Sequence, residues 1–171
     1  MMKKNKGQVE YIASPYSSHD ADLVELNYKL VTAFVSDRVS KGHVALSPIT
    51  YGHTLLSWVD MPGDWEFWKN FCISLLDKCD KMIVLKMDGW DKSLGVAAEI
   101  EHCEKHGIPV EYVEPHWIEV TNDPTDFSVI NEYDDVWVKF DDGQIMRFSE
   151  EDHPFACVTH FMPFSMGYDQ D

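Results

Sequence analysis

Residues 81–113 read KMIVLKMDGWDKSLGVAAEIEHCEKHGIPVEYV, and their pattern is that of a strand, a loop, a helix and a second strand. Met82 to Leu85 is a short apolar run, which is typical of a buried strand. Ser93 to His106 carries apolar residues at helical spacing and is followed by Gly107, a common helix terminator. Ile108 to Val113 is the next apolar segment. A helix between two such strands predicts parallel, right-handed pairing.

The same alternation continues toward the N-terminus. Val9 to Ala13 and Val44 to Leu46 are apolar runs that each end at a Ser-Pro pair, so both are predicted strands. Helical spacing of apolar residues predicts helices over about 20–41 and from Trp65 to Cys79, whereas residues 49–63 are interpreted as a loop. Residues 9–113 are therefore predicted to form an α/β domain, with helices on both faces of an open parallel sheet of four or five strands. Ligands of such sheets bind beyond the carboxyl ends of the strands.

Residues 114–171 differ in composition from the rest of the chain. They carry 2 basic and 14 acidic side chains, whereas residues 1–113 carry 12 and 16. Apolar residues at 136–140 and 144–148 flank Asp141-Asp142-Gly143, a sequence that predicts a β-hairpin. His153, Cys157 and His160 are spaced like metal ligands, but no fourth ligand is evident and no metal is predicted. We interpret 114–171 as an acidic, aromatic-rich C-terminal extension that contains this β-hairpin.

Composition excludes several classes of protein. The 171 residues are 44% hydrophobic and 26% charged, which is typical of a globular protein and not of a disordered one. The net charge of −16 disfavours binding to nucleic acid or to anionic membranes. No apolar run approaches the roughly 20 residues that span a bilayer, so a cytoplasmic protein is expected. Its four cysteines are expected to be reduced thiols.

The loop and helix at 88–99 contain the candidate chemistry. Ser93 is a good N-cap, and the free amides after it favour an anion, assisted by the helix dipole. Gly95 weakens the helix but allows a ligand to approach the backbone. Glu99 follows one turn later on the same face. An anion site beside a carboxylate suits cleavage of the N-glycosidic bond of a nucleotide. The alternative interpretation is the solvated face of an amphipathic helix.

Four segments resemble the nucleoside 2-deoxyribosyltransferase-like superfamily, which includes the 2′-deoxynucleoside 5′-phosphate N-hydrolases. The resemblance covers residues 9–113, and the matching motifs are Tyr11-Ile12-Ala13-Ser14-Pro15-Tyr16-Ser17, Ser47-Pro48-Ile49 to His53, Leu76-Asp77-Lys78-Cys79-Asp80, and Gly89-Trp90-Asp91-Lys92-Ser93-Leu94-Gly95-Val96-Ala97-Ala98-Glu99. It implies a flavodoxin-like sheet, no cofactor or metal, and a homo-oligomer.

The resemblance also implies roles for individual residues. Glu99 matches the nucleophile of the family, Tyr11 the tyrosine that orients it, and Ser93 the serine that holds a 5′-phosphate. Cys72 stands where the family usually has Asp, and no arginine follows Pro15 near the expected phosphate, where Lys92 is a possible substitute. The expected catalytic residues are Glu99 and Tyr11, and the expected substrate-binding residues are Ser14, Pro15, Tyr16, His53, Asp88, Trp90, Ser93 and Gly95.

Three functions are consistent with these residues. The first is cleavage or transfer at the N-glycosidic bond of a nucleoside 5′-monophosphate, with a nucleotide or nucleoside as the small-molecule partner. The second is the same chemistry on NAD or a nucleotide second messenger. The third is a non-catalytic module that binds a nucleotide or uses its acidic extension to contact a basic protein surface.

Overall fold

The computed structural model describes residues 7–115, 118–119, 136–140, 145–147 and 158–163. The chain divides into two compact units, Met1–Pro115 and His116–Asp171. The first unit contains the parallel sheet and all the helices considered below. Each unit is described separately.

The first unit is built on a four-stranded parallel sheet. Its strands are β1 (Val9–Ala13), β2 (Val44–Leu46), β3 (Lys81–Leu85) and β4 (Val110–Val113). They lie in the order β2-β1-β3-β4, and every neighbouring pair is parallel. This order corresponds to the first four strands of a flavodoxin-like sheet, so the predicted α/β class is confirmed.

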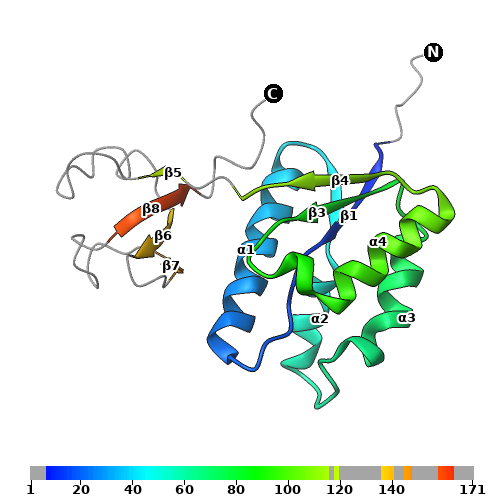
Figure 1. The fold of residues 1–171 in the computed structure, drawn as a ribbon, viewed down its shortest axis with the longest axis horizontal. Helices are drawn as coiled ribbons and strands as arrows, with labels where there is room; N and C mark the ends of the chain where they lie inside the picture. The colour runs from blue at the N-terminus through cyan, green and yellow to red at the C-terminus, as the bar shows by residue number, and fades with distance from the viewer. Residues whose placement is uncertain (1–6, 116–117, 120–135, 141–144, 148–157, 164–171) are drawn as a thin grey trace. The chain divides into compact units, whose positions relative to one another are not determined.

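Helices cover both faces of this sheet. Figure 1 shows α1 (Ala21–Ser40) on one side and α3 (Trp65–Leu76) and α4 (Leu94–His106) on the other. Tyr11 and Ala13 share a buried cluster with α3 and α4 residues. The intervening Ile12 points to the opposite face, because successive strand residues alternate, and it too is fully buried. The continuous apolar runs of the sequence thus reflect strands covered on both sides.

The segment 49–63, interpreted from sequence as a loop, is helical in its first half. Helix α2 spans Pro48–Leu56, and the side chain of Ser47 caps it by accepting a hydrogen bond from the Ile49 amide at 3.2 Å. Proline suits the first helical position, since its missing N–H would have no partner there. The loop interpretation was therefore wrong, because Ser-Pro marked a helix start as well as a strand end. The correction matters because α2 lies directly beyond the carboxyl end of β2.

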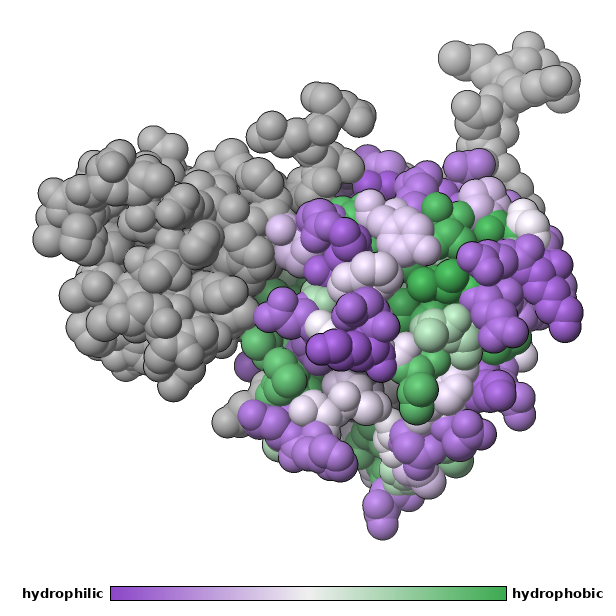
Figure 2. Space-filling model, viewed as in Figure 1, coloured by the Kyte–Doolittle hydropathy of each residue, from purple (hydrophilic) through white to green (hydrophobic). Residues whose placement is uncertain are grey.

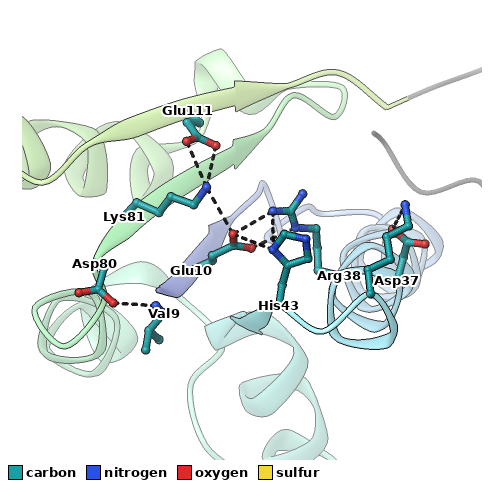
Figure 3. Close-up of polar contacts among 9 residues, drawn as sticks. Val9, Glu10, Asp37, Arg38, His43, Asp80, Lys81 and Glu111 are labelled. Carbon is teal, nitrogen blue, oxygen red and sulfur yellow. Dashed lines mark hydrogen bonds and ion pairs between the residues drawn. The ribbon is translucent and has the colours of Figure 1, made fainter. Parts of the chain in front are cut away.

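A buried ion-pair network lies at the amino-terminal part of β1 (Figure 3). The Glu10 carboxylate accepts hydrogen bonds from Arg38 Nε at 3.0 Å and Nη2 at 2.8 Å, and Lys81 Nζ lies 3.3 Å away. Burial by itself would raise the pKa of Glu10, but the hydrogen bonds and charges of Arg38 and Lys81 hold that pKa below its ordinary value. The network therefore joins α1 to the sheet through a carboxylate that is charged at neutral pH.

Glu10→Gln is expected to destabilise the protein by about 3 kcal/mol at pH 7, because it removes the charge that balances a buried guanidinium. The stabilisation exists above the unfolded-state pKa of Glu10 and is lost as the pH falls through its lower folded-state pKa. The difference between variant and parent should therefore shrink below about pH 4. Chemical denaturation at pH 7 and pH 3.5 measures it.

Glu111→Gln is the matched control for that experiment. Glu111 pairs with the same Lys81, at 3.0 Å, but its side chain is exposed. Exposed ion pairs contribute less than about 1 kcal/mol, so this variant should be nearly neutral. Equal losses for the two variants would contradict a special role for the buried pair.

The second unit contains a four-stranded sheet with the order β5-β8-β6-β7. Its strands are β5 (Ile118–Glu119), β6 (Val136–Phe140), β7 (Ile145–Arg147) and β8 (Val158–Pro163). Strands β6 and β7 pair antiparallel, which confirms the predicted hairpin strands, while the turn at 141–144 lies outside the described residues. Strands β5 and β8 extend the hairpin into a sheet that the sequence pattern did not indicate. His153 and Cys157 also lie outside the described residues.

Figure 2 shows hydrophobic residues in groups between hydrophilic ones on this face of the first unit. Within the described ranges, no helix combines the length and the apolar character that crossing a membrane requires.

Candidate active site

A cavity of about 790 Å³ lies at the carboxyl edge of the parallel sheet. This volume is within the range of small-molecule binding sites. The segments that line it follow β1 (residues 13–18), β2 (the start and middle of α2) and β3 (residues 88–99), with further walls from α1 and α3. The cavity therefore occupies the position at which open α/β sheets bind their ligands.

Glu99 is a buried carboxylate on the wall of this cavity. It lies in the second turn of α4, and only 4% of its surface is exposed. Burial raises its pKa to about 7, although the hydrogen bond from Tyr11 acts in the opposite direction. This finding excludes the alternative interpretation of Glu99 as part of a solvated helix face. A carboxylate with such a pKa, placed in a cavity, is typical of a functional group.

Tyr11 holds Glu99 from the neighbouring strand. The Tyr11 hydroxyl on β1 donates a hydrogen bond of 2.5 Å to Glu99 Oε1, across 88 residues of sequence. Burial, followed by the charge of Glu99, raises the pKa of Tyr11 well above its ordinary value, so the phenol stays protonated and can donate. Tyr11 does not itself line the cavity but fixes the carboxylate that does.

Cys72 lies in the same buried group, on α3. Burial and the nearby Glu99 charge raise the pKa of its thiol to about 12, so it is neutral at physiological pH. It is one of three described cysteines, with Cys79 and Cys103, and all three are free thiols as expected. Cys157 lies outside the described residues. The thiol adds no second negative charge beside Glu99, unlike the Asp of the resembled family.

The first turn of α4 also faces the cavity. Ser93 is the N-cap, and its side chain accepts a hydrogen bond from the Val96 amide at 3.4 Å. The preceding amides of Leu94 and Gly95 have no carbonyl partner within the helix, as at any helix start. Lys92 adjoins them on the cavity wall. The predicted anion site is thus brought to the same cavity as Glu99.

Gly95 has a structural explanation that differs from the expected one. A Cβ atom at this position would lie 3.2 Å from the Trp65 ring of α3. Gly52 on α2 accommodates Trp68 in the same way, at 3.3 Å. Both glycines therefore allow tryptophan rings of α3 to pack against neighbouring helices. Gly95 still lines the cavity, but the space that its missing side chain leaves is bordered by the Trp65 ring.

His53 and Tyr16 form a second polar group on the cavity wall. The Tyr16 hydroxyl lies 2.9 Å from His53 Nδ1, and His53 Nε2 lies 3.3 Å from a Glu25 carboxylate oxygen. Tyr28 stacks on the imidazole, with ring centroids 3.8 Å apart. In the tautomer that carries its proton on Nε2, toward Glu25, Nδ1 accepts a hydrogen bond from the Tyr16 hydroxyl. The imidazole is thus held on three sides.

The remaining predicted residues divide into two groups. Ser14, Pro15 and Asp88 line the cavity. Trp90 does not: it packs beside the core cluster, contacts the Tyr112 ring edge-on at 5.6 Å and lies under the Lys86 ammonium at 5.5 Å. Trp90 could stack on a base or close the core by its sequence position alone, and the structure fits the second role, because the short helix at Trp90–Lys92 directs the ring toward β4.

Sequence reasoning missed several lining residues, of which Trp65, Trp68 and Asn27 bear most on the site. Trp65 and Trp68 were expected only to form the buried face of a helix, and Asn27 was not considered. Asn27 lies on the same face of α1 as Leu23, a buried polar residue among apolar spacings. That interruption of the pattern was the available signal.

Within residues 7–115 and the described strands of the second unit, no cluster of three potential metal ligands is present.

Comparison with known proteins places the chain in a family without assigning an activity. A search of curated proteins finds no match. A family model described as a domain of unknown function matches residues 8–114, which is most of the first unit and more than half of the chain. The chain belongs to this family, DUF1937.

Proposed function

We propose that the protein cleaves the N-glycosidic bond of a (deoxy)nucleoside 5′-monophosphate, with Glu99 as the nucleophile. The observation that carries the proposal is the buried Glu99 carboxylate, held by Tyr11 on the wall of a ligand-sized cavity. The first turn of α4 supplies the amides for a phosphate at the same cavity. The resemblance of these segments to the nucleoside 2-deoxyribosyltransferase-like superfamily supports the choice of substrate.

The chemistry follows a double displacement. A Glu99 oxygen forms a bond to C1′ as the C1′–N bond breaks, and the electron pair of that bond departs with the base, which takes up a proton. Water then attacks C1′ and releases the carboxylate, so the products are a free base and a pentose 5-phosphate. In transfer, a second base replaces water.

Base release is the direct test. The purified protein is incubated with ribo- and deoxynucleoside monophosphates, the matching nucleosides and NAD, and free base is followed by chromatography. Release from monophosphates above nucleosides is expected, because only the former place an anion at the first turn of α4. Release from NAD alone would favour the second of the three functions, and no release from any substrate would contradict the proposal.

The reaction rate is expected to increase with pH and to level off above about pH 7. Only the ionised form of Glu99 attacks C1′, and its pKa is about 7. The pH dependence of kcat/KM measures this in the free enzyme. A rate that increases as the pH falls below 6 would mean that the protonated carboxyl is the active form.

A further inference from the structure

We propose that Asn27, together with Ser14, reads the hydrogen-bonding edge of the nucleobase in the cavity. This inference rests on the proposed function, since it assigns a role to a residue toward the base of that substrate. Asn27 lies on α1, whereas Glu99 and the first turn of α4 lie on a different wall. The residue would determine specificity and would take no part in bond cleavage.

The first observation is that Asn27 is buried without a partner. Only 6% of its surface is exposed, it lines the cavity, and no hydrogen bond joins its side chain to another described residue. The amide atoms of Asn27 are not among the fully buried unpaired atoms, so they are open to the cavity and not sealed in the core. An amide that faces a cavity is satisfied when a ligand completes its bonds.

Ser14 provides the second, independent observation. It follows β1, is 6% exposed and lines the same cavity. Its Oγ atom is buried and has no hydrogen-bond partner among the residues that the structure describes. Two elements, β1 and α1, thus each contribute an unpaired neutral polar side chain to one cavity.

The chemistry of the amide favours a base over a phosphate. Asn offers one acceptor and two donors in a plane. A base edge with an adjacent donor and acceptor, such as N6 and N7 of adenine, pairs with both of its groups. A phosphate only accepts hydrogen bonds and would leave the amide oxygen unpaired. The lining residues nearest in sequence on α1 are Leu23 and Val24, and α2 adds Pro48 and Ile49, so the surroundings are apolar, as a base requires.

The experiment measures binding without turnover. In a Glu99→Gln background, calorimetry gives the Kd of deoxynucleoside monophosphates carrying each base and of 2-deoxyribose 5-phosphate, which lacks a base. Asn27→Leu and Asn27→Ala, which remove the amide at two different side-chain sizes, are expected to weaken binding of at least one nucleotide by about 10- to 100-fold. Binding of the sugar phosphate should change by less than about twofold, because its contacts do not include the amide. Asn70→Leu, the same change at an exposed residue of α3 that does not line the cavity, is the matched control.

The outcomes are distinguishable. Loss of nucleotide binding with unchanged sugar-phosphate binding supports the base subsite. Equal losses for both ligands, no loss for any nucleotide, or no nucleotide binding by the Glu99→Gln parent would overturn it. If either Asn27 variant unfolds, the other and Ser14→Ala, which also gives up no hydrogen bond within the described residues, provide the comparison. If the wild type releases base and the Asn27 variants bind nucleotides as the parent does, only the base subsite is overturned. If the Asn27 variants bind nucleotides more weakly but the wild type releases no base, only the cleavage proposal is overturned.

Discussion

Glu99→Gln is expected to reduce base release by about 10⁴-fold or more, since the amide cannot act as the nucleophile. The substitution keeps the size of the side chain and leaves Tyr11 a hydrogen-bond acceptor. Binding of substrate should therefore change much less than kcat. Initial rates over a range of nucleotide concentrations separate the two effects. Activity that persists in this variant would reject the assigned nucleophile.

The same variant should be more stable than the wild type at alkaline pH. The pKa of Glu99 is raised from 4.5 to about 7, so the folded state holds a proton that the unfolded state releases. The stability linked to this proton is fully present below the unfolded-state pKa and is lost as the pH rises through about 7. The loss is about 3 kcal/mol by pH 8, and Gln avoids it. Thermal unfolding at pH 8 should show a higher Tm for Glu99→Gln, with a smaller difference at pH 5.

The pairing of lost activity with gained stability also serves as a folding control. A variant that is inactive because it is misfolded would melt at a lower temperature at both pH values. A charged group kept at a cost to the fold is typical of functional sites. Equal Tm values at pH 8 would contradict the burial of an ionised Glu99.

Tyr11→Phe is expected to have the second largest effect on the rate of base release. In the wild type, the hydrogen bond from Tyr11 favours the charged form of Glu99. The variant lacks this bond, so the pKa of Glu99 should be raised further. A hydrogen bond to a charged group contributes about 1.5–3 kcal/mol. The midpoint of the kcat/KM profile should move up by about one to two pH units, and activity at pH 7 should fall by about 5- to 50-fold, because Glu99 is already half protonated at pH 7 in the wild type. Activity should recover in part at higher pH.

Tyr16→Phe is the matched control for Tyr11→Phe. Tyr16 also lies at the cavity, but its hydroxyl contacts His53 and not Glu99. The variant can change KM, while the midpoint of the pH profile should stay near 7. A midpoint that moves equally in both variants would mean that Tyr11 acts through general disturbance of the cavity.

The strands and most of the first unit could be predicted because each buried element has a simple periodic pattern. Four apolar runs separated by helical spacings are sufficient for a parallel sheet, and the sheet brings the segments after β1, β2 and β3 together. Glu99 and Ser93 were predictable for the same reason, since both lie on the helix that follows β3. Helix α2 was missed because its threonines and Gly52 lower helix propensity and because Ser47-Pro48 was assigned only to the end of the preceding strand.

The contacts that sequence could not reveal are those between elements far apart in the chain. The packing of Trp65 on Gly95 and the turning of Trp90 toward Tyr112 each depend on helix placement. The high pKa of Glu99 likewise results from burial beneath α3 and β1, which no local pattern encodes. The interruption of the apolar pattern at Asn27 is visible in the sequence, but its place at the cavity follows only from the position of α1.

The stereochemistry of solvolysis tests the role of Glu99 most directly. The protein is allowed to cleave a β-deoxynucleoside monophosphate in water containing methanol, and the anomeric configuration of the methyl 2-deoxyriboside 5-phosphate is determined by NMR. Attack by Glu99 followed by attack of methanol inverts C1′ twice, so the β-anomer is the result that this account predicts. Formation of the α-anomer would mean that methanol attacks C1′ directly and would contradict a covalent intermediate on Glu99.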